Sequence, residues 1–148
     1  MSTIIPGRLY LGNVLNVNRL QWLDQHQIRT IVCVARGEDV TIKSEIKQAK
    51  TVHQFEIRDD LGQVLDFDAI LPIIEDAMTQ GAVLVNCAVG ISRSPSFVIA
   101  LLMKTRGWSL DEAFVYVKRA RPKIAPNDEF MAQLRAYEMR LGTRSDKK

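Results

Sequence analysis

Cysteine and histidine are both scarce in this chain of 148 residues, which contains two of each. The cysteines, Cys33 and Cys87, are too few for a disulfide scaffold, and free thiols persist in a reducing compartment. Cysteine and histidine are also too scattered to have the spacing of a zinc site. We therefore expect no metal and no cofactor, and we expect a cytoplasmic location, with the nucleus as the alternative.

Long hydrophobic runs are also missing. No apolar stretch approaches the roughly 20 residues that a membrane-spanning helix needs. The first six residues, Met1 to Pro6, have neither the basic start nor the long apolar segment of a secretory signal. The sequence therefore predicts neither a membrane span nor a secretory leader.

Length and composition are those of one ordinary globular domain, with 47% hydrophobic and 25% charged residues. The net charge of +3 is uneven: residues 104–148 carry 11 Lys/Arg and 6 Asp/Glu, which leaves −2 for the remainder. A basic C-terminal third can attract anionic substrates, although a solvated helix face explains most of these charges equally well. We place a folded domain at residues 1–142 and a basic flexible tail at residues 143–148.

Apolar periodicity alternates along the chain between strand and helix patterns. Short apolar or alternating runs predict strands, and apolar residues at helical spacing, bounded by caps, predict helices. The expected strands are at 4–5, 9–11, 30–35, 51–57 and 83–85, and the expected helices are at 16–26, 42–49, 66–80, 95–106, after Ser109 and around 130–141. This alternation is typical of the α/β class, with a central, mostly parallel sheet flanked by helices.

The most informative stretch is the nine residues from Asn86 to Ser94, which read NCAVGISRS. An apolar strand precedes them and an apolar helix follows. A loop in that position directs backbone N–H groups at one point, where the helix dipole adds positive potential. The sequence therefore predicts a phosphate site whose backbone cradle is formed by residues 88–93, namely Ala88, Val89, Gly90, Ile91, Ser92 and Arg93.

Two side chains of this stretch add chemistry to the predicted cradle. Arg93 can bind two phosphate oxygens with its planar guanidinium. The same positive field stabilises a thiolate on Cys87, so one loop can hold both the substrate and a nucleophile. A cysteine can instead be a small core residue. The order of strand, glycine-containing loop, arginine, serine and helix favours the site.

The loop resembles the phosphate loop of the cysteine-dependent protein tyrosine phosphatases, and most closely that of their dual-specificity branch. That family has His-Cys-x-x-Gly-x-Ser-Arg-Ser, and the chain matches it at Cys87, Gly90, Ser92, Arg93 and Ser94, with Asn86 in place of the histidine. Residues 5–12 and 121–138 are also similar to the family's pattern. The resemblance covers nearly the whole chain and implies a protein tyrosine phosphatase-like fold in a small, single-domain atypical member.

The resemblance also implies roles for individual residues. Cys87 would attack phosphorus and form a phosphocysteine, and Asp59, with Asp60 as the alternative, would protonate the leaving group. Ser94 would assist departure of the thiolate. Asn86 and Asn127 would be supporting residues, Asn127 by bracing nearby loops. With asparagine in place of histidine at position 86, we expect a working but slower site.

Three functions remain open at this point. The first is a phosphatase for phosphotyrosine, and also for phosphoserine or phosphothreonine, in proteins. The second is removal of phosphate from RNA 5′ ends or from phosphoinositides, which would suit a more basic loop than one with Ala88, Val89 and Ile91 at its variable positions. The third is a phosphate-binding adaptor with little catalysis. The expected partners are phosphorylated proteins, nucleic acid remains a candidate substrate, and the oligomeric state is open.

Overall fold

The computed structural model describes residues 1–142, so the tail expected at 143–148 lies outside the described residues. A five-stranded sheet with the order β1-β2-β5-β3-β4 forms the centre of the fold. Its strands are β1 (Ser2–Ile5), β2 (Leu9–Gly12), β3 (Ile28–Cys33), β4 (Thr51–Gln54) and β5 (Ala82–Asn86). The expected strand pattern is therefore confirmed, although β4 ends three residues before position 57.

The sheet is mixed but mostly parallel, as expected. β5 pairs in parallel with both β2 and β3, and β3 pairs in parallel with β4, whereas β1 is antiparallel to β2. All five residues of β5 are buried because the strand is central and covered on both faces. The C-terminal end of this central strand is the usual position of a ligand site in such a sheet.

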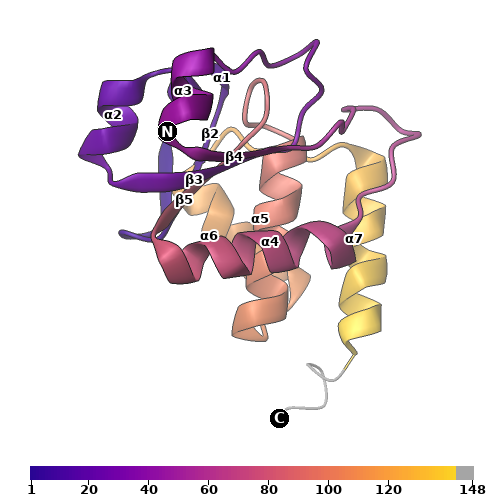
Figure 1. Cartoon of the computed structure of the whole chain (residues 1–148). Coiled ribbons are helices and arrows are strands. Elements are labelled where there is room, and N and C mark those ends of the chain that lie inside the picture. The colour runs from indigo at the N-terminus through magenta and orange to yellow at the C-terminus, as the bar shows by residue number, and fades with distance from the viewer. Residues whose placement is uncertain (143–148) are drawn as a thin grey trace.

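Helices cover both faces of the sheet (Figure 1). Short helices α1, α2 and α3 contact one face, and α4, α5 and α6 contact the other, with α7 packed against α5. Their bounds are α1 (Val14–Val17), α2 (Leu20–Gln25), α3 (Ser44–Ala49), α4 (Phe67–Gln80), α5 (Arg93–Arg106), α6 (Leu110–Ala120) and α7 (Asp128–Leu141). No helix within residues 1–142 is both long and apolar enough to cross a membrane.

The single helix expected at residues 16–26 is wrong, because the structure has two short helices there. The cap of the first is Asn13, whose side chain accepts hydrogen bonds from the backbone N–H groups of Leu15 and Asn16. Asn18 ends this helix, and its side-chain amide donates to Thr41 O at 2.8 Å. A contact 23 residues away thus interrupts a pattern that looks continuous in the sequence.

Helix α5 passes through the centre of the molecule, with every residue from Arg93 to Met103 buried. Phe97 packs edge-on against Phe67 of α4, with 5.6 Å between ring centroids, and Phe67 also contacts Tyr137 of α7 at 4.8 Å. These aromatic contacts fix the direction of α5 relative to the sheet. They thereby fix the position of its N-terminus, which faces the loop after β5.

Candidate active site

The loop from Cys87 to Ser92 joins the end of β5 to the N-terminus of α5. Residues outside the loop bind its carbonyl groups: Val14 N–H donates to Ala88 O at 3.0 Å and Ala125 N–H to Ile91 O at 2.7 Å. The carbonyl just before the loop, Asn86 O, accepts from Val34 N–H at 2.9 Å. In a planar trans peptide the carbonyl and the following N–H point in opposite directions. Outward carbonyls therefore direct the N–H groups of the loop towards its centre.

Arg121 binds the two carbonyls at the middle of the loop. Its Nε donates to Gly90 O at 2.7 Å and its Nη2 to Val89 O at 3.1 Å, while Nη1 donates to Ser2 Oγ at 3.2 Å. Burial lowers the pKa of this guanidinium from its usual range, and nearby Cys87 has a smaller, opposite effect. A cation is thus fixed directly behind the cradle, where it adds positive potential.

Gly90 is required at its position for two reasons. Its φ of +76° is in the left-handed region that disfavours residues with a side chain. A Cβ atom there would also lie 2.5 Å from Arg121 Nη2 and 2.7 Å from Gly12 O. Any larger residue would therefore displace either the arginine behind the loop or strand β2.

Cys87 is 2% exposed and receives polar contacts at its sulfur. Gly90 N–H donates to Sγ at 3.3 Å, and Ser94 Oγ lies 3.1 Å from Sγ. Hydrogen bonds to the charged form of a group favour that form. The sulfur of Cys87 thus has two polar contacts and lies next to the N-terminus of a 14-residue helix, whose dipole adds positive potential.

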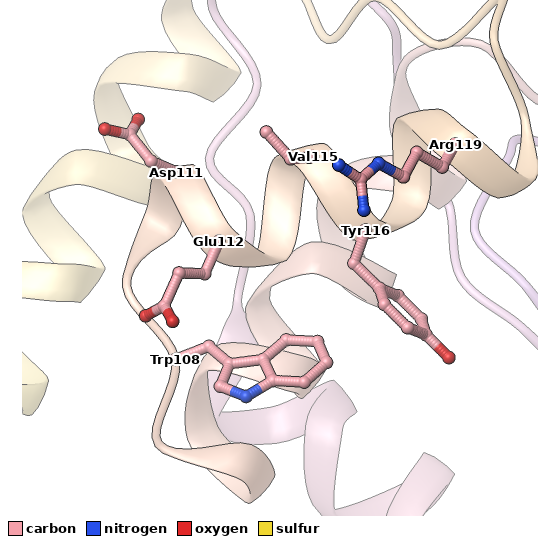
Figure 2. A pocket seen from close by; sticks show the side chains of 6 residues that line it. All are labelled: Trp108, Asp111, Glu112, Val115, Tyr116 and Arg119. Carbon is pink, nitrogen blue, oxygen red and sulfur yellow. The ribbon is translucent and has the colours of Figure 1, made fainter.

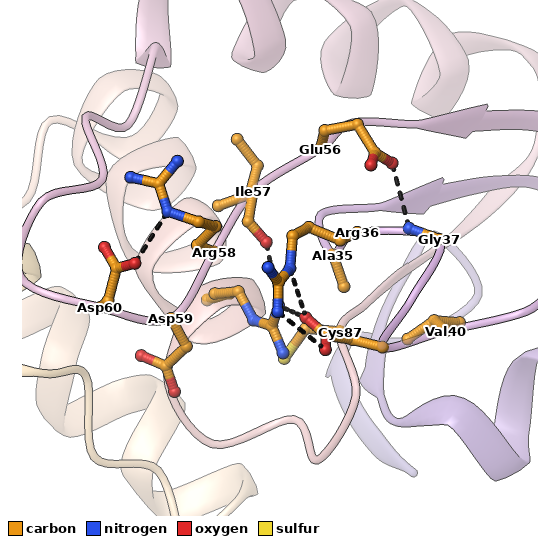
Figure 3. Close-up of polar contacts among 12 residues, drawn as sticks. Ala35, Arg36, Gly37, Val40, Glu56, Ile57, Arg58, Asp59, Asp60 and Cys87 are labelled. Atoms are coloured by element: carbon orange, nitrogen blue, oxygen red, sulfur yellow. Dashed lines mark hydrogen bonds and ion pairs between the residues drawn. The ribbon is translucent and has the colours of Figure 1, made fainter.

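Arg93 is the first residue of α5, and its guanidinium is held on one side. Nη1 donates to Asp39 Oδ2 at 2.7 Å and to Ile57 O at 2.9 Å. Nε and Nη2 make no hydrogen bond within residues 1–142. Figure 3 shows the polar contacts around this site, with Ile57 and Cys87 on either side of the dashed contacts.

Asp59 and Asp60 have different environments. The Asp60 carboxylate binds Arg58 Nε at 2.7 Å and accepts from Gly62 N at 2.9 Å, and the hydrogen bond from Arg58 is the main cause that lowers its pKa. The Asp59 carboxylate is in no ion pair within residues 1–142 and accepts from Asn127 Nδ2 at 3.0 Å. Figure 3 shows Asp60 directed at Arg58, with Asp59 outside that pair.

Asn127 connects three parts of the site. Its side chain caps α7 by accepting from Phe130 N at 2.8 Å, and its Nδ2 also donates to Asp60 O at 3.3 Å. Its backbone N–H donates to Ser92 Oγ at 3.0 Å. Ser92 therefore bonds to the segment before α7, outside its own loop. The loop carrying Asp59 and the phosphate loop are joined through one residue.

Asn86, the residue before Cys87, is completely buried. Its Nδ2 lies 3.7 Å from Cys33 Sγ and 3.5 Å from Cys87 O, and its Oδ1 has no hydrogen-bond partner within residues 1–142. Cys33 is a buried core residue of β3. The side chain at position 86 is therefore weakly bonded and leaves one buried acceptor unsatisfied.

Two residues of the site are absent from the sequence-based set. Arg121 belongs to the C-terminal segment that is similar to the phosphatase family, and nothing in its sequence neighbourhood indicates a position behind the loop. Asp39 follows a predicted buried strand in the segment Arg36-Gly37-Glu38-Asp39. A carboxylate after a strand of a parallel sheet is the only signal that could have found it.

A hollow of about 480 Å³ elsewhere on the surface has no comparable chemistry (Figure 2). Trp108 and five residues of α6 line it, among them Glu112 and Tyr116. Glu112 accepts from Ser109 N–H in a capping box at the start of α6, and the Tyr116 hydroxyl donates to Ile4 O. These groups hold α6 in place. Within residues 1–142 no group of three or more metal-ligating side chains is found.

Comparison with known proteins finds similarity to protein phosphatases both in a family model and in individual relatives. Residues 9–140 match the family model described as "Dual specificity phosphatase, catalytic domain". The chain is 35% identical to protein phosphatase Slingshot homolog 3 of Rattus norvegicus over 93% of its length, and 35% identical to dual specificity protein phosphatase Mpk3 of Drosophila melanogaster over 95%. It spans 21% and 34% of those two proteins, respectively.

A solved structure resembles the whole domain. It is the human tyrosine phosphatase-like serine/threonine/tyrosine-interacting protein, with a TM-score of 0.87 and 33% sequence identity. The match covers 95% of this chain and 97% of that one. The similarity therefore extends over nearly the whole chain.

The two cysteines should differ strongly in reactivity. Burial raises the pKa of Cys33 to about 12, so this thiol stays protonated at neutral pH. Cys87 has a backbone N–H and a hydroxyl at its sulfur, and we expect it to react first with iodoacetate and, reversibly, with peroxide. Mass spectrometry of partly modified protein measures the order. Modification of Cys33 before Cys87 would contradict both assignments.

Asn86→His should accelerate alkylation of Cys87 near pH 6. A histidine that donates to the loop would hold its N–H groups in better register, and a charged one would add a direct Coulomb attraction for the thiolate. We expect about a tenfold gain at pH 6, equivalent to ~1.4 kcal/mol of preference for the thiolate, and a small gain at pH 7.5. Asn86→Gln is the neutral control. Equal rates in the histidine variant and the natural protein would show that position 86 does not tune the nucleophile.

Proposed function

Because the chain belongs to the dual specificity phosphatases, we propose that it hydrolyses phosphotyrosine, and also phosphoserine and phosphothreonine, in proteins through a phosphocysteine intermediate. The observation that carries the proposal is the position of Cys87 Sγ. It belongs to the first residue of a loop whose carbonyls are bonded outwards, and it lies 3.3 Å from Gly90 N and 3.1 Å from Ser94 Oγ. One cradle thus serves both the nucleophile and the phosphate.

The first step is attack of the Cys87 thiolate on phosphorus. The sulfur–phosphorus bond forms as the bond from phosphorus to the ester oxygen breaks. The three remaining phosphoryl oxygens lie among the inward N–H groups of residues 88–93, and the guanidinium of Arg93 binds two of them. Fixed donors of this kind stabilise the charge that builds up on the oxygens without a further cost of reorganisation.

The leaving oxygen needs a proton, and Asp59 is the better candidate to supply it. Asp60 is held ionised by Arg58, since that contact lowers its pKa. Asp59 lacks such an ion pair and is tied by Asn127 to the segment that also contacts the phosphate loop. A positioned general acid typically contributes ~10²–10⁴-fold in rate.

Hydrolysis of the intermediate would return the enzyme to its starting state. Water attacks phosphorus, gives up a proton to the Asp59 carboxylate, and the sulfur leaves as a thiolate. The Ser94 hydroxyl, 3.1 Å from Sγ, can donate a hydrogen bond to that thiolate as it departs. Because the serine is fully buried on α5, this donor stays in place through the cycle.

Phosphoproteins are the preferred substrate class because the variable loop positions Ala88, Val89 and Ile91 carry no positive charge. RNA 5′ ends and phosphoinositides carry more charge and would favour basic residues there. An adaptor role is the second candidate, and its support is Asn86 together with the similarity to a protein named as an interacting protein. We also propose a cytoplasmic or nuclear location, since the reaction needs a reduced thiol.

A substrate panel tests this function directly. The natural protein and Cys87→Ser are compared on phosphopeptides, RNA 5′-triphosphate, phosphoinositides and an aryl phosphate. We expect phosphopeptide turnover to be highest, and Cys87→Ser to abolish turnover while it keeps phosphate-ester binding, because the N–H cradle and Arg93 remain. An adaptor would bind phosphopeptides and give no turnover that depends on Cys87. Activity of the serine variant within tenfold of the natural protein would reject the cysteine mechanism.

Asp59→Asn should lower kcat by ~10²–10³-fold on a poor leaving group such as an alkyl phosphate. The loss should be much smaller on an activated aryl phosphate, whose leaving group needs little protonation. Asp60→Asn is the matched control, since it changes the neighbouring carboxylate on the same loop. Steady-state kinetics on the two substrates decide between them: if Asp60→Asn shows this pattern and Asp59→Asn does not, Asp60 is the acid.

A further inference from the structure

We propose that Asp39 is a positioning residue for Arg93, holding one side of its guanidinium so that the other side faces the substrate phosphate. The proposal rests on the function proposed above and adds a residue to that site. Asp39 lies 54 positions before Arg93 in the chain, and the two side chains meet at 2.7 Å. It touches neither the nucleophile nor the expected phosphate oxygens, so its effect would be exerted through the arginine.

The hydrogen bonds of Arg93 divide the guanidinium into two sides. Both N–H groups of Nη1 are used, one by Asp39 Oδ2 and the other by Ile57 O at 2.9 Å. Nε and Nη2 together present the planar pair of donors that binds two oxygens of a phosphate side by side. The contacts to Asp39 and Ile57 therefore leave that pair of donors available.

Asp39 is itself held firmly. Arg36 donates to its carboxylate from Nε at 3.2 Å and from Nη2 at 3.3 Å, and Asp39 N–H donates back to Arg36 O at 2.9 Å. Gln54 Nε2 on β4 donates to Ala35 O and Val40 O, which fixes both ends of the segment. The carboxylate is thus supported by the sheet and reaches the arginine from a fixed place.

The ion pair between Arg93 and Asp39 is partly buried, which strengthens the attraction between the two side chains. The Arg93 side chain is 8% exposed and that of Asp39 is 26% exposed, so water screens their attraction less than at an open surface. The hydrogen bonds from Arg36 and then Arg93 lower the pKa of Asp39, so the carboxylate remains charged through the acidic range of an assay. Two cations share one anion, and the cluster keeps a net positive charge for the incoming phosphate.

An arginine that is already ordered binds a phosphate more tightly than one that must be ordered on binding. Its long side chain has several rotatable bonds, and ordering it when substrate binds would cost conformational entropy. Asp39 orders it beforehand. The expected consequence is that loss of the carboxylate weakens binding of a bare oxyanion, in addition to lowering the rate.

Asp39→Asn tests this without a change in size. We expect inorganic phosphate to bind about tenfold more weakly by calorimetry, and kcat/KM for an aryl phosphate to fall by roughly 10- to 100-fold, because a charge-assisted bond is replaced by a neutral one. Asp39→Glu should recover part of both losses. Glu38→Gln is the matched control: it removes the neighbouring negative charge, and we expect both quantities to stay within about twofold of the natural protein.

The same measurements distinguish three roles of Asp39: positioning Arg93, stabilising the fold, and competing with phosphate for Arg93. Partial unfolding of the variant would lower kcat and the amount of binding-competent protein, yet leave the dissociation constant for phosphate unchanged, and that result would overturn the proposal. Tighter phosphate binding in Asp39→Asn would show that the carboxylate competes with phosphate for Arg93, which also overturns it. A natural protein that binds no phosphate would contradict it too. Weaker binding in the variant with no turnover in the natural protein would support the positioning role and reject the catalytic function.

Discussion

The site depends above all on hydrogen bonds that its loop carbonyls accept from the rest of the fold. A short loop between a strand and a helix has no regular pattern to satisfy its own backbone, and buried carbonyls without partners are costly. Here the residue after β3, the start of α1, Arg121 and the segment before α7 supply the donors. Because peptides are planar, that outward bonding also orients the N–H groups inward. The outward orientation of the carbonyls therefore gives them hydrogen-bond partners and, at the same time, directs the N–H groups to a point where an anion can bind.

Two arginines, Arg121 and Arg93, contact different groups around this loop. Arg121 is buried behind it, holds Val89 O and Gly90 O, and is surrounded by protein. Arg93 donates from Nη1 to Asp39 and Ile57, and within residues 1–142 its Nε and Nη2 make no hydrogen bond. Arg121 supports the shape of the loop from behind, whereas Arg93 is the proposed phosphate ligand. This division explains why Gly90 is irreplaceable: its Cβ would enter the space of the arginine behind the loop.

The sequence predicts what is local and misses what joins distant segments. The phosphate loop, α5 and the capping box of α6 could be found because their signals lie within about ten consecutive residues. The break between α1 and α2 could not, since the side-chain amide of Asn18 donates to Thr41 O, 23 residues away, as well as to Val14 O in its own helix. The pairing of Arg93 with Asp39 and the position of Arg121 could not be found for the same reason. Sequence patterns report helical and strand periods, whereas these contacts depend on how strands are ordered in the sheet.

The same reasoning separates the two adjacent aspartates. From the sequence, Asp59 and Asp60 differ by one position, and the choice between them rested on a family pattern. The structure adds a physical distinction: Arg58 holds Asp60 ionised, whereas Asp59 is linked through Asn127 to the phosphate loop. A general acid must give up a proton near neutral pH, and a carboxylate whose charge is stabilised by an arginine is poorly suited to carry one. The arginine next to Asp60 thus favours its neighbour for the acid role, and Asn127 keeps that neighbour in register with the loop where the ester bond would break.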